Sequence, residues 1–339
     1  MNRNALDSKD VRLIWFITQE ENGFALTSEY AKSIRRISRL SGLDRELVRR
    51  RLAKMKRTGF LKEWLPLLNP TLLGEKVAKI WFDVDLVRQA RPKQEILEEI
   101  RSMPGVVVLV NHLGTSILLL TLYRNETELR RTIQWVKTRA NGFNITCIRK
   151  GTQGCAFSPS VTDWILLKAV FVSPSASTDE LALATTLSAR TVRRKLAKLV
   201  QEGVILSFLT IDASALDGMM YADLLVVCAG EADKARVDRE IVGRLRDCMV
   251  HANLMDEVSS FGVLLPSASR RMEILRWVTA QPGVLSARIE VAEEMVLTYQ
   301  PLHELSKAKI ALELSRLGLR QDVQGTTNFP REALAHFSD

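Results

Sequence analysis

The stretch Val48-Arg-Arg-Arg-Leu-Ala-Lys54 recurs 144 positions later as Val192-Arg-Arg-Lys-Leu-Ala-Lys198, and the same offset carries Gly59 onto Gly203. Self-similarity on this scale predicts two copies of one structural unit in a chain of 339 residues. Between the copies lies Gly151–Pro159, whose glycine, serine and proline content is typical of a linker. We therefore expect the second copy to begin just after this linker.

Each copy begins with an apolar-periodic helix followed by two shorter helices joined by a tight turn. The turns are Ser41-Gly42-Leu43 and Thr185-Thr186-Leu187, followed by Asp44 and Ser188 as N-caps of the third helices. An extended apolar segment comes next, expected at Phe60–Leu68 and Val204–Ile211. The helices before the turns are expected at Ser8–Thr18 and Ile34–Leu40, and at Thr162–Val172 and Asp179–Ala184. This order predicts a winged helix-turn-helix in each copy.

A second group of elements follows each winged helix-turn-helix, in the order βαββαβ of the ferredoxin-like topology. In the first copy the elements are expected at Val77–Leu86, Lys93–Ser102, Val106–Asn111, Ser116–Tyr123, Glu126–Thr138 and Phe143–Ile148. In the second they are expected at Met220–Cys228, Asp233–Arg246, Val250–Leu254, Ser260–Leu265, Ser269–Thr279 and Leu285–Val291. The predicted fold class is α+β. Its domains are two winged helix-turn-helix domains (1–69 and 153–213), two βαββαβ domains (70–152 and 214–301), and a C-terminal helix and tail (302–339).

The net charge of +9 is concentrated in one segment. Between Lys32 and Lys62 there are twelve basic residues, opposed only by Asp44 and Glu46. A solvated charged face usually mixes both signs, so this imbalance favours a polyanionic partner.

The third helices are expected to display their basic residues, because the apolar positions Val48, Leu52 and Met55 share the opposite stripe of the helix wheel. Arginine in the first half of such a helix reaches guanine edges in a major groove, and later or flanking cations reach phosphates. The predicted base-reading residues are Arg45, Arg49, Arg50, Arg190, Arg193 and Arg194. The predicted phosphate-binding residues are Arg35, Arg36, Arg39, Lys54, Lys56, Arg57 and Lys198. The predicted partner is double-stranded DNA, read at two non-identical half-sites because Glu46 stands where the second copy has Arg190.

The opening Leu6-Asp7-Ser-Lys-Asp10, together with Pro104-Gly105-Val106 before a strand and Gly114 in the next hairpin, resembles the Lrp/AsnC (feast/famine) transcriptional regulators. The resemblance implies a RAM-type βαββαβ domain that dimerises sheet against sheet and often binds an amino-acid effector beside that hairpin. It assigns a weak effector site to His112, Gly114, Thr115 and Ser116. The family's acidic-aromatic run after the glycine is absent, and the second copy has Asp256-Glu257 without an equivalent glycine. One chain supplies both halves, so an internal pseudo-dimer is expected, and a homodimer stays open.

Two other functions fit the same order of elements. Siroheme decarboxylases resemble it too, and such an enzyme would need histidine or cationic groups near the second βαββαβ strand, where His112 and His251 fall. An architectural DNA-binding protein without a ligand is the other alternative. Because an enzyme does not require matched basic third helices, we expect no enzymatic activity.

No cofactor or metal is expected, since the four cysteines form no CxxC pair. The uncharged run Met103–Tyr123 is interrupted by Pro104-Gly105 and a polar turn, which predicts a buried hairpin instead of a membrane span. With no signal-peptide pattern at the N-terminus, we expect a cytoplasmic protein.

Overall fold

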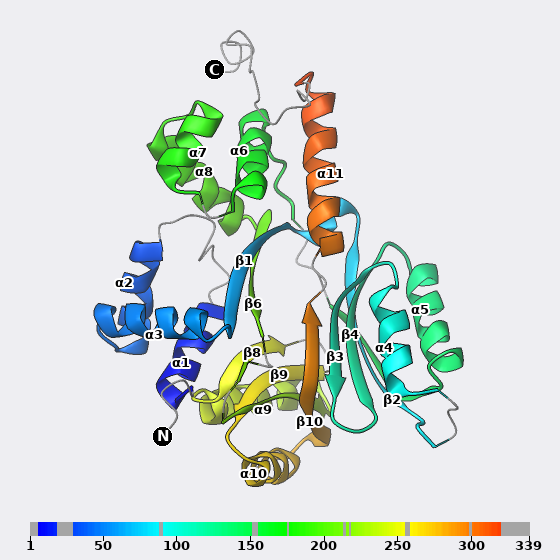
Figure 1. Ribbon diagram of the computed structural model, residues 1–339. Helices are drawn as coiled ribbons and strands as arrows, with labels where there is room; N and C mark the ends of the chain where they lie inside the picture. The colour runs from blue at the N-terminus through cyan, green and yellow to red at the C-terminus, as the bar shows by residue number, and fades with distance from the viewer. Residues whose placement is uncertain are drawn as a thin grey trace.

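The structure is a computed structural model and describes residues 6–18, 30–87, 91–150, 155–174, 176–212, 215–216, 218–254, 258–297 and 300–319. One three-helix group lies at the left of Figure 1 and the other at the top, whereas helices α4 (Lys93–Arg101) and α5 (Glu126–Thr138) lie at the right and helices α9 (Glu231–Leu245) and α10 (Ala268–Thr279) at the bottom. A two-stranded ribbon, β1 (Leu61–Leu68) with β6 (Ile205–Ile211), runs between the two three-helix groups (Figure 1).

The first helix-turn-helix consists of α1 (Ser8–Thr18), α2 (Tyr30–Ser41) and α3 (Arg45–Arg57). Asp44 caps α3 by accepting a hydrogen bond from the backbone N–H of Leu47 at 2.9 Å. The predicted inward stripe Val48, Leu52 and Met55 is fully buried, which confirms the orientation of α3. The basic residues therefore lie on the other faces of the helix.

The second helix-turn-helix consists of α6 (Val161–Val172), α7 (Thr178–Thr185) and α8 (Ala189–Gln201). Ser160 and Asp163 form a capping box, so α6 begins one residue earlier than expected. Ser188 caps α8, and Thr186 takes the left-handed backbone conformation in the turn between α7 and α8. Val192, Leu196 and Leu199 are buried.

Strands β1 (Leu61–Leu68) and β6 (Ile205–Ile211) pair with each other, antiparallel, in a two-stranded sheet. Each was expected only as the wing of its own helix-turn-helix. A single wing strand leaves its backbone N–H and C=O groups unpaired, and pairing the two wings satisfies both. The consequence is a direct backbone link between the two helix-turn-helix groups.

The remaining strands form one eight-stranded sheet in the order β5-β2-β4-β3-β10-β7-β9-β8. Residues 70–150 contribute η1 (Pro70–Leu73), β2 (Lys76–Val84), α4 (Lys93–Arg101), β3 (Val106–His112), β4 (Ser116–Tyr123), α5 (Glu126–Thr138) and β5 (Gly142–Lys150). Residues 220–297 contribute β7 (Met220–Cys228), α9 (Glu231–Leu245), β8 (Met249–Leu254), β9 (Val258–Leu265), α10 (Ala268–Thr279) and β10 (Val284–Leu297). We call these two groups the first and second βαββαβ units. Both follow the predicted order; the common origin of the two halves stays a prediction.

Strand β10 is twice as long as expected and joins the two units. Its first half pairs with β7, and after an irregularity between Ala292 and Glu294 its second half pairs with β3, where Met295 lies opposite Val110. Side chains from both units, including Trp81 and Leu225, also pack in one cluster. The expected end at Val291 was wrong. The acidic pair Glu293 and Glu294 looks like the end of a strand in the sequence, but in the folded chain β3 pairs with this segment.

Helix α11 (Gln300–Arg316) packs mainly against α6 and β1, with further contacts to η1 and β3. Ile310 and Leu314 enter the core of α6–α8, and Leu302 packs with Leu67 of β1. The hydroxyl of Ser306 accepts a hydrogen bond from the backbone N–H of Leu68 at 3.2 Å. The helix therefore holds the second helix-turn-helix against β1; the tail from 320 onward lies outside the described residues.

We expect Gly105→Ala to destabilise the fold by about 2–5 kcal/mol, the sum of left-handed strain and overpacking. Gly105 has φ +85°, and an added Cβ would lie 2.8 Å from the carbonyl oxygen of Leu122. Gly114→Ala is the matched control, because it has φ +82° with nothing within 4 Å and carries only the strain of about 1–2 kcal/mol. Urea unfolding of both variants measures the difference, and equal losses would contradict the close-contact argument.

Candidate nucleic-acid interface

The predicted base-reading arginines are exposed on both third helices. Arg45, Arg49 and Arg50 on α3 and Arg190, Arg193 and Arg194 on α8 are all solvent-exposed. Arg49 forms an ion pair with Glu46 one turn earlier, and both side chains are mostly exposed. An exposed pair of this kind is worth under about 1 kcal/mol, so it does not prevent Arg49 from engaging an anion.

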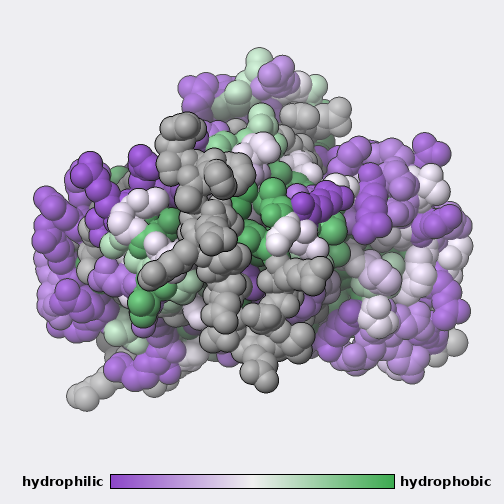
Figure 2. Space-filling model, turned by 90° about the horizontal axis from the view of Figure 1, so that it is seen from above, coloured by the Kyte–Doolittle hydropathy of each residue, from purple (hydrophilic) through white to green (hydrophobic). Residues whose placement is uncertain are grey.

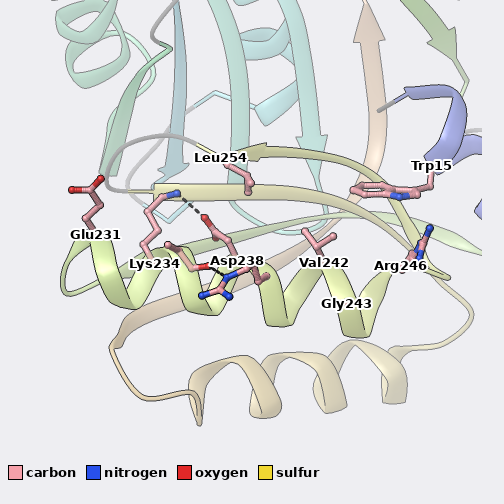
Figure 3. A pocket seen from close by; sticks show the side chains of 10 residues that line it. Trp15, Glu231, Lys234, Asp238, Val242, Gly243, Arg246 and Leu254 are labelled. Atoms are coloured by element: carbon pink, nitrogen blue, oxygen red, sulfur yellow. Dashed lines mark hydrogen bonds and ion pairs between the residues drawn. The ribbon is translucent and has the colours of Figure 1, made fainter. Parts of the chain in front are cut away.

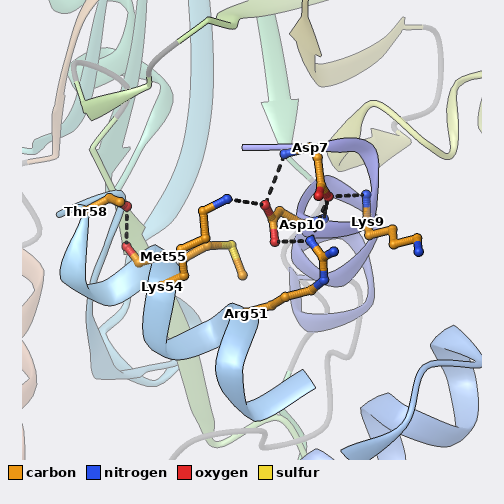
Figure 4. A network of polar contacts seen from close by, with 7 residues as sticks. All are labelled: Asp7, Lys9, Asp10, Arg51, Lys54, Met55 and Thr58. Carbon is orange, nitrogen blue, oxygen red and sulfur yellow. Dashed lines mark hydrogen bonds and ion pairs between the residues drawn. The ribbon is translucent and has the colours of Figure 1, made fainter. Parts of the chain in front are cut away.

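Two basic residues of α3 turn back into the protein (Figure 4). Arg51 donates to Asp7 at 2.7 Å and to Asp10 at 2.8 Å, and Lys54 donates to Asp10 at 3.1 Å. Asp10 is completely buried, so its charge needs these partners. Burial raises the pKa of Asp7, but the hydrogen bond and charge of Arg51, together with the backbone N–H groups of Lys9 and Asp10, outweigh burial and hold that pKa below its ordinary value. Lys54, predicted to bind phosphate, thus fastens α3 to α1.

The second helix-turn-helix has an equivalent ion pair between its third and first helices. Lys195, which occupies the position of Arg51 in the repeat, donates to Asp163 of α6 at 2.9 Å. Lys198, predicted to bind phosphate, is exposed and lies over the ring of Phe157 at 4.8 Å. Two cations of α3 and one of α8 therefore make structural ion pairs with the first helix of their own group, while the predicted base-reading arginines face solvent.

The other predicted phosphate contacts surround α3. Lys56 and Arg57 near its end are exposed, as are Arg35 and Arg39 on α2; the side chain of Arg36 lies outside the described residues. Hydrophilic side chains gather over α2 and α3 at the left of Figure 2, with a comparable group over α4 and α5 at the right. What distinguishes the α2–α3 surface is the sign of its charge, because α4 and α5 carry acidic residues as well.

The four weak effector residues separate into two pairs. Gly114 and Thr115 are exposed in the turn between β3 and β4, whereas His112 and Ser116 are buried at the ends of these strands. The ammonium of Lys93 donates to the carbonyl oxygens of His112, Gly114 and Ser116 at 2.7, 2.8 and 3.1 Å. Burial lowers the pKa of Lys93 to about 8, so the ammonium that holds this turn is mostly charged at neutral pH.

His112 belongs to a buried chain of polar contacts between the two units, which we call the sheet junction (Trp81, His112, Ser116, Tyr221 and Asp223). The imidazole Nε2 of His112 lies 3.2 Å from Asp223 Oδ2, and Asp223 Oδ1 accepts from the hydroxyl of Tyr221 at 3.2 Å. A carboxylate only accepts, so Nε2 carries a proton. The hydroxyl of Ser116 lies 3.3 Å from Nδ1 and accepts a hydrogen bond from the indole N–H of Trp81 at 2.6 Å.

Two further cations surround the sheet junction. Lys79 donates to Ser260 at 2.7 Å across the units, and the guanidinium of Arg288 lies 4.2 Å from the ring centre of Trp81. Sequence reasoning missed Lys79 and Asp223, although each is a charged residue inside an otherwise apolar strand. That pattern is a usable signal, because a buried charge requires a partner elsewhere in the fold.

No group of three or more His, Cys, Asp or Glu side chains among the described residues is arranged to hold a metal ion. Within the same residues, no helix combines the length and apolar character needed to cross a membrane. His251 is half-buried and stacks on Tyr221, with the ring centroids 6.4 Å apart. Asp256 and Glu257 lie outside the described residues.

Comparison with solved structures finds the same architecture in an enzyme. The crystal structure of the siroheme decarboxylase NirDL matches 90% of this chain and 99% of its own, with a TM-score of 0.50 and 14% identity. Regulators match a smaller share of the chain: Escherichia coli AsnC covers 41% of it (TM-score 0.32, 14% identity, 94% of its own chain). Mycobacterium tuberculosis LrpA covers 39% (TM-score 0.30, 18% identity, 91% of its own chain). No protein-family model and no curated protein matches the sequence.

The expectation that the chain has no enzymatic activity is contradicted by the full-length match, because the architecture that it shares is that of an enzyme. The matched basic third helices do not argue against catalysis. One fold can support unrelated functions, so the order of its elements excludes neither DNA binding nor catalysis.

Proposed function

We propose that the chain is a DNA-binding transcriptional regulator of the Lrp/AsnC type that places α3 and α8 in major grooves of duplex DNA. The observation that carries the proposal is the exposure of three arginines on each of these helices, while their apolar stripes are buried. Arginine's planar fork suits both guanine edges and phosphate oxygens. Lys54 is reassigned from phosphate binding to the contact between α3 and α1.

One chain carries both recognition helices, and the β1–β6 ribbon connects their groups. We propose that the halves act as an internal pseudo-dimer on an operator with two non-identical half-sites. The α3 half supplies most of the electrostatic attraction, because Arg35, Arg39, Lys56 and Arg57 add to its exposed arginines.

Fluorescence anisotropy with labelled duplex DNA tests this function. Affinity is expected to fall with salt at a log–log slope of about −0.9 for each phosphate contacted. Genome-wide footprinting supplies the operator, and a perfect palindrome would contradict the unequal half-sites. Absence of duplex binding at moderate salt contradicts the function itself.

A second candidate is an enzymatic activity on a tetrapyrrole, favoured by the match to siroheme decarboxylase over nearly the whole chain. His112 does not fit as an iron ligand in this conformation, because both of its ring nitrogens are engaged and it is fully buried. His251, which is only half-buried, is the residue of the predicted pair that a tetrapyrrole would reach.

Incubation of the protein with siroheme under anaerobic conditions, followed by mass spectrometry, tests the second candidate. Decarboxylation would appear as the loss of carbon dioxide from the tetrapyrrole. An unchanged Soret band and an unchanged product mass, together with salt-dependent DNA binding, would leave the regulator as the function.

A further inference from the structure

The face of α3 opposite its buried stripe carries four exposed residues at the helical spacing i, i+4, i+7 and i+11. We call it the outer stripe of α3 (Glu46, Arg50, Ala53 and Arg57). The outer stripe of α8, 144 positions later, consists of Arg190, Arg194, Ala197 and Gln201, which are also exposed. The two stripes share an arginine followed by an alanine and differ at both ends. The third helices therefore present the same groups in the middle of a groove and different groups at its ends.

Ion pairs on one flank of each third helix hold its outer stripe in place. Arg51 and Lys54 of α3 both reach Asp10 of α1, and α8 has the equivalent ion pair to α6. Helix α1 is held in turn by Trp15, which packs in the core of the second βαββαβ unit at one end of the cavity beside α9 (Figure 3). These contacts fix the rotation of the third helices about their axes, so the outer stripes are the faces that meet a groove.

The first position of the outer stripe carries opposite charges in the two halves. Glu46 holds it on α3, and Arg190 holds it on α8. The side chain of Glu46 is 74% exposed, and its Oε2 pairs with the guanidinium of Arg49. Its other oxygen, Oε1, has no hydrogen-bond partner among the described residues. DNA phosphates repel a carboxylate, and the charge of Arg49 offsets that repulsion, so Glu46 can approach a base edge.

We propose that Glu46 and Arg190 determine the base pair at which the two half-sites differ, a step that rests on the proposed DNA-binding function. Glu46 accepts a hydrogen bond from the N4 amine of a cytosine, and Arg190 donates to O6 and N7 of a guanine at the equivalent position. In both half-sites the shared arginine of the outer stripe donates to a guanine, and the shared alanine contacts the methyl group of a thymine. The half-sites therefore share a guanine and a thymine, and a cytosine in one replaces a guanine in the other.

Selection of binding sequences from a random pool of duplex DNA by the full chain, followed by fluorescence anisotropy on the selected operator, tests the inference. The original chain is expected to select cytosine at this position of one half-site and guanine in the other. Exchange of that cytosine for guanine is expected to weaken binding at least about tenfold. Glu46→Arg is expected to select guanine in both half-sites, and Arg190→Glu cytosine in both.

Two further variants separate base reading from charge. Glu46→Gln is expected to favour adenine at the same position, because an amide pairs with the N6 and N7 atoms of adenine. A carboxylate that only stabilises the start of α3 predicts no such change of base. Glu98→Arg on α4, at the opposite side of the molecule (Figure 1), makes the same change of charge as Glu46→Arg and is expected to leave the selected bases unchanged.

The possible failures of the inference and of the DNA-binding function are distinct. Sequence-specific binding whose base preference neither Glu46→Arg nor Arg190→Glu alters overturns the inference and leaves the function standing. A change of preference in Glu98→Arg equal to that in Glu46→Arg overturns it as well. Absence of duplex binding by the original chain at moderate salt overturns both.

Discussion

The triple substitution of Arg45, Arg49 and Arg50 by alanine is expected to lower the affinity for duplex DNA by at least about a hundredfold. Each arginine contact with a base or phosphate is worth about 1–3 kcal/mol, and 1.4 kcal/mol corresponds to a factor of ten. The salt dependence is expected to become shallower, with the log–log slope smaller by about 0.9 for each lost phosphate contact. Fluorescence anisotropy across a salt series measures both quantities.

The matched control replaces Arg130, Arg131 and Lys137 of α5, which are exposed and lie on the opposite side of the molecule (Figure 1). This control removes the same formal charge, so comparing the two variants separates general electrostatic attraction to DNA from direct contact by α3. All six residues are exposed, and neither triple variant should lose much stability. Equal losses of DNA affinity in the two variants would show that α3 is not the interface.

Asp223→Ala is expected to lower the free energy of unfolding by about 3–5 kcal/mol, because removing one partner of a buried pair strands the other groups. The substitution removes the acceptor of the His112 N–H and one hydrogen bond of the Tyr221 hydroxyl, both within the sheet junction. Since His112 comes from the first unit and Asp223 from the second, the loss also weakens the contact between units. Urea denaturation followed by circular dichroism measures it.

Glu98→Ala is the control, because Glu98 is mostly exposed and its ion pair with Arg101 is worth under about 1 kcal/mol. A loss for Asp223→Ala no larger than that of the control would contradict a structural role of the sheet junction.

The pH dependence offers an independent check with Asp223→Asn. Burial raises the pKa of Asp223, but the hydrogen bond from His112, the charge of Lys79 and smaller electrostatic contributions from His112 and His251 together outweigh burial and hold that pKa below its ordinary value. A lowered carboxyl pKa stabilises the folded state above the ordinary pKa, and this contribution is lost as the pH falls through the folded value. The difference in free energy of unfolding between the original protein and Asp223→Asn should therefore become smaller below about pH 4.

The helical parts of the fold were predictable because their information is local. Apolar residues at helical spacing placed Val48, Leu52 and Met55 inward, and burial confirms it. Capping residues such as Asp44 marked where helices begin. The order of strands and helices in both βαββαβ units followed from the same short-range patterns.

The candidate DNA-binding site was predictable only in part. A helix wheel separates displayed from buried residues, and it identified the exposed arginines of α3 and α8. It does not reveal that Lys54 reaches the buried Asp10, because that partner belongs to another helix. The partner of a half-buried cation depends on which helices meet in the folded chain.

By itself, then, the sequence determined two basic third helices, their buried stripes and the recurring order of elements. The tertiary structure alone decided that β1 pairs with β6, that β10 continues onto β3, and that His112 meets Asp223 between the units. The reason is physical: periodicity along a chain reports which face of an element is buried. Which distant strand or charge covers that face is settled by long-range packing, for which the local pattern carries no signal.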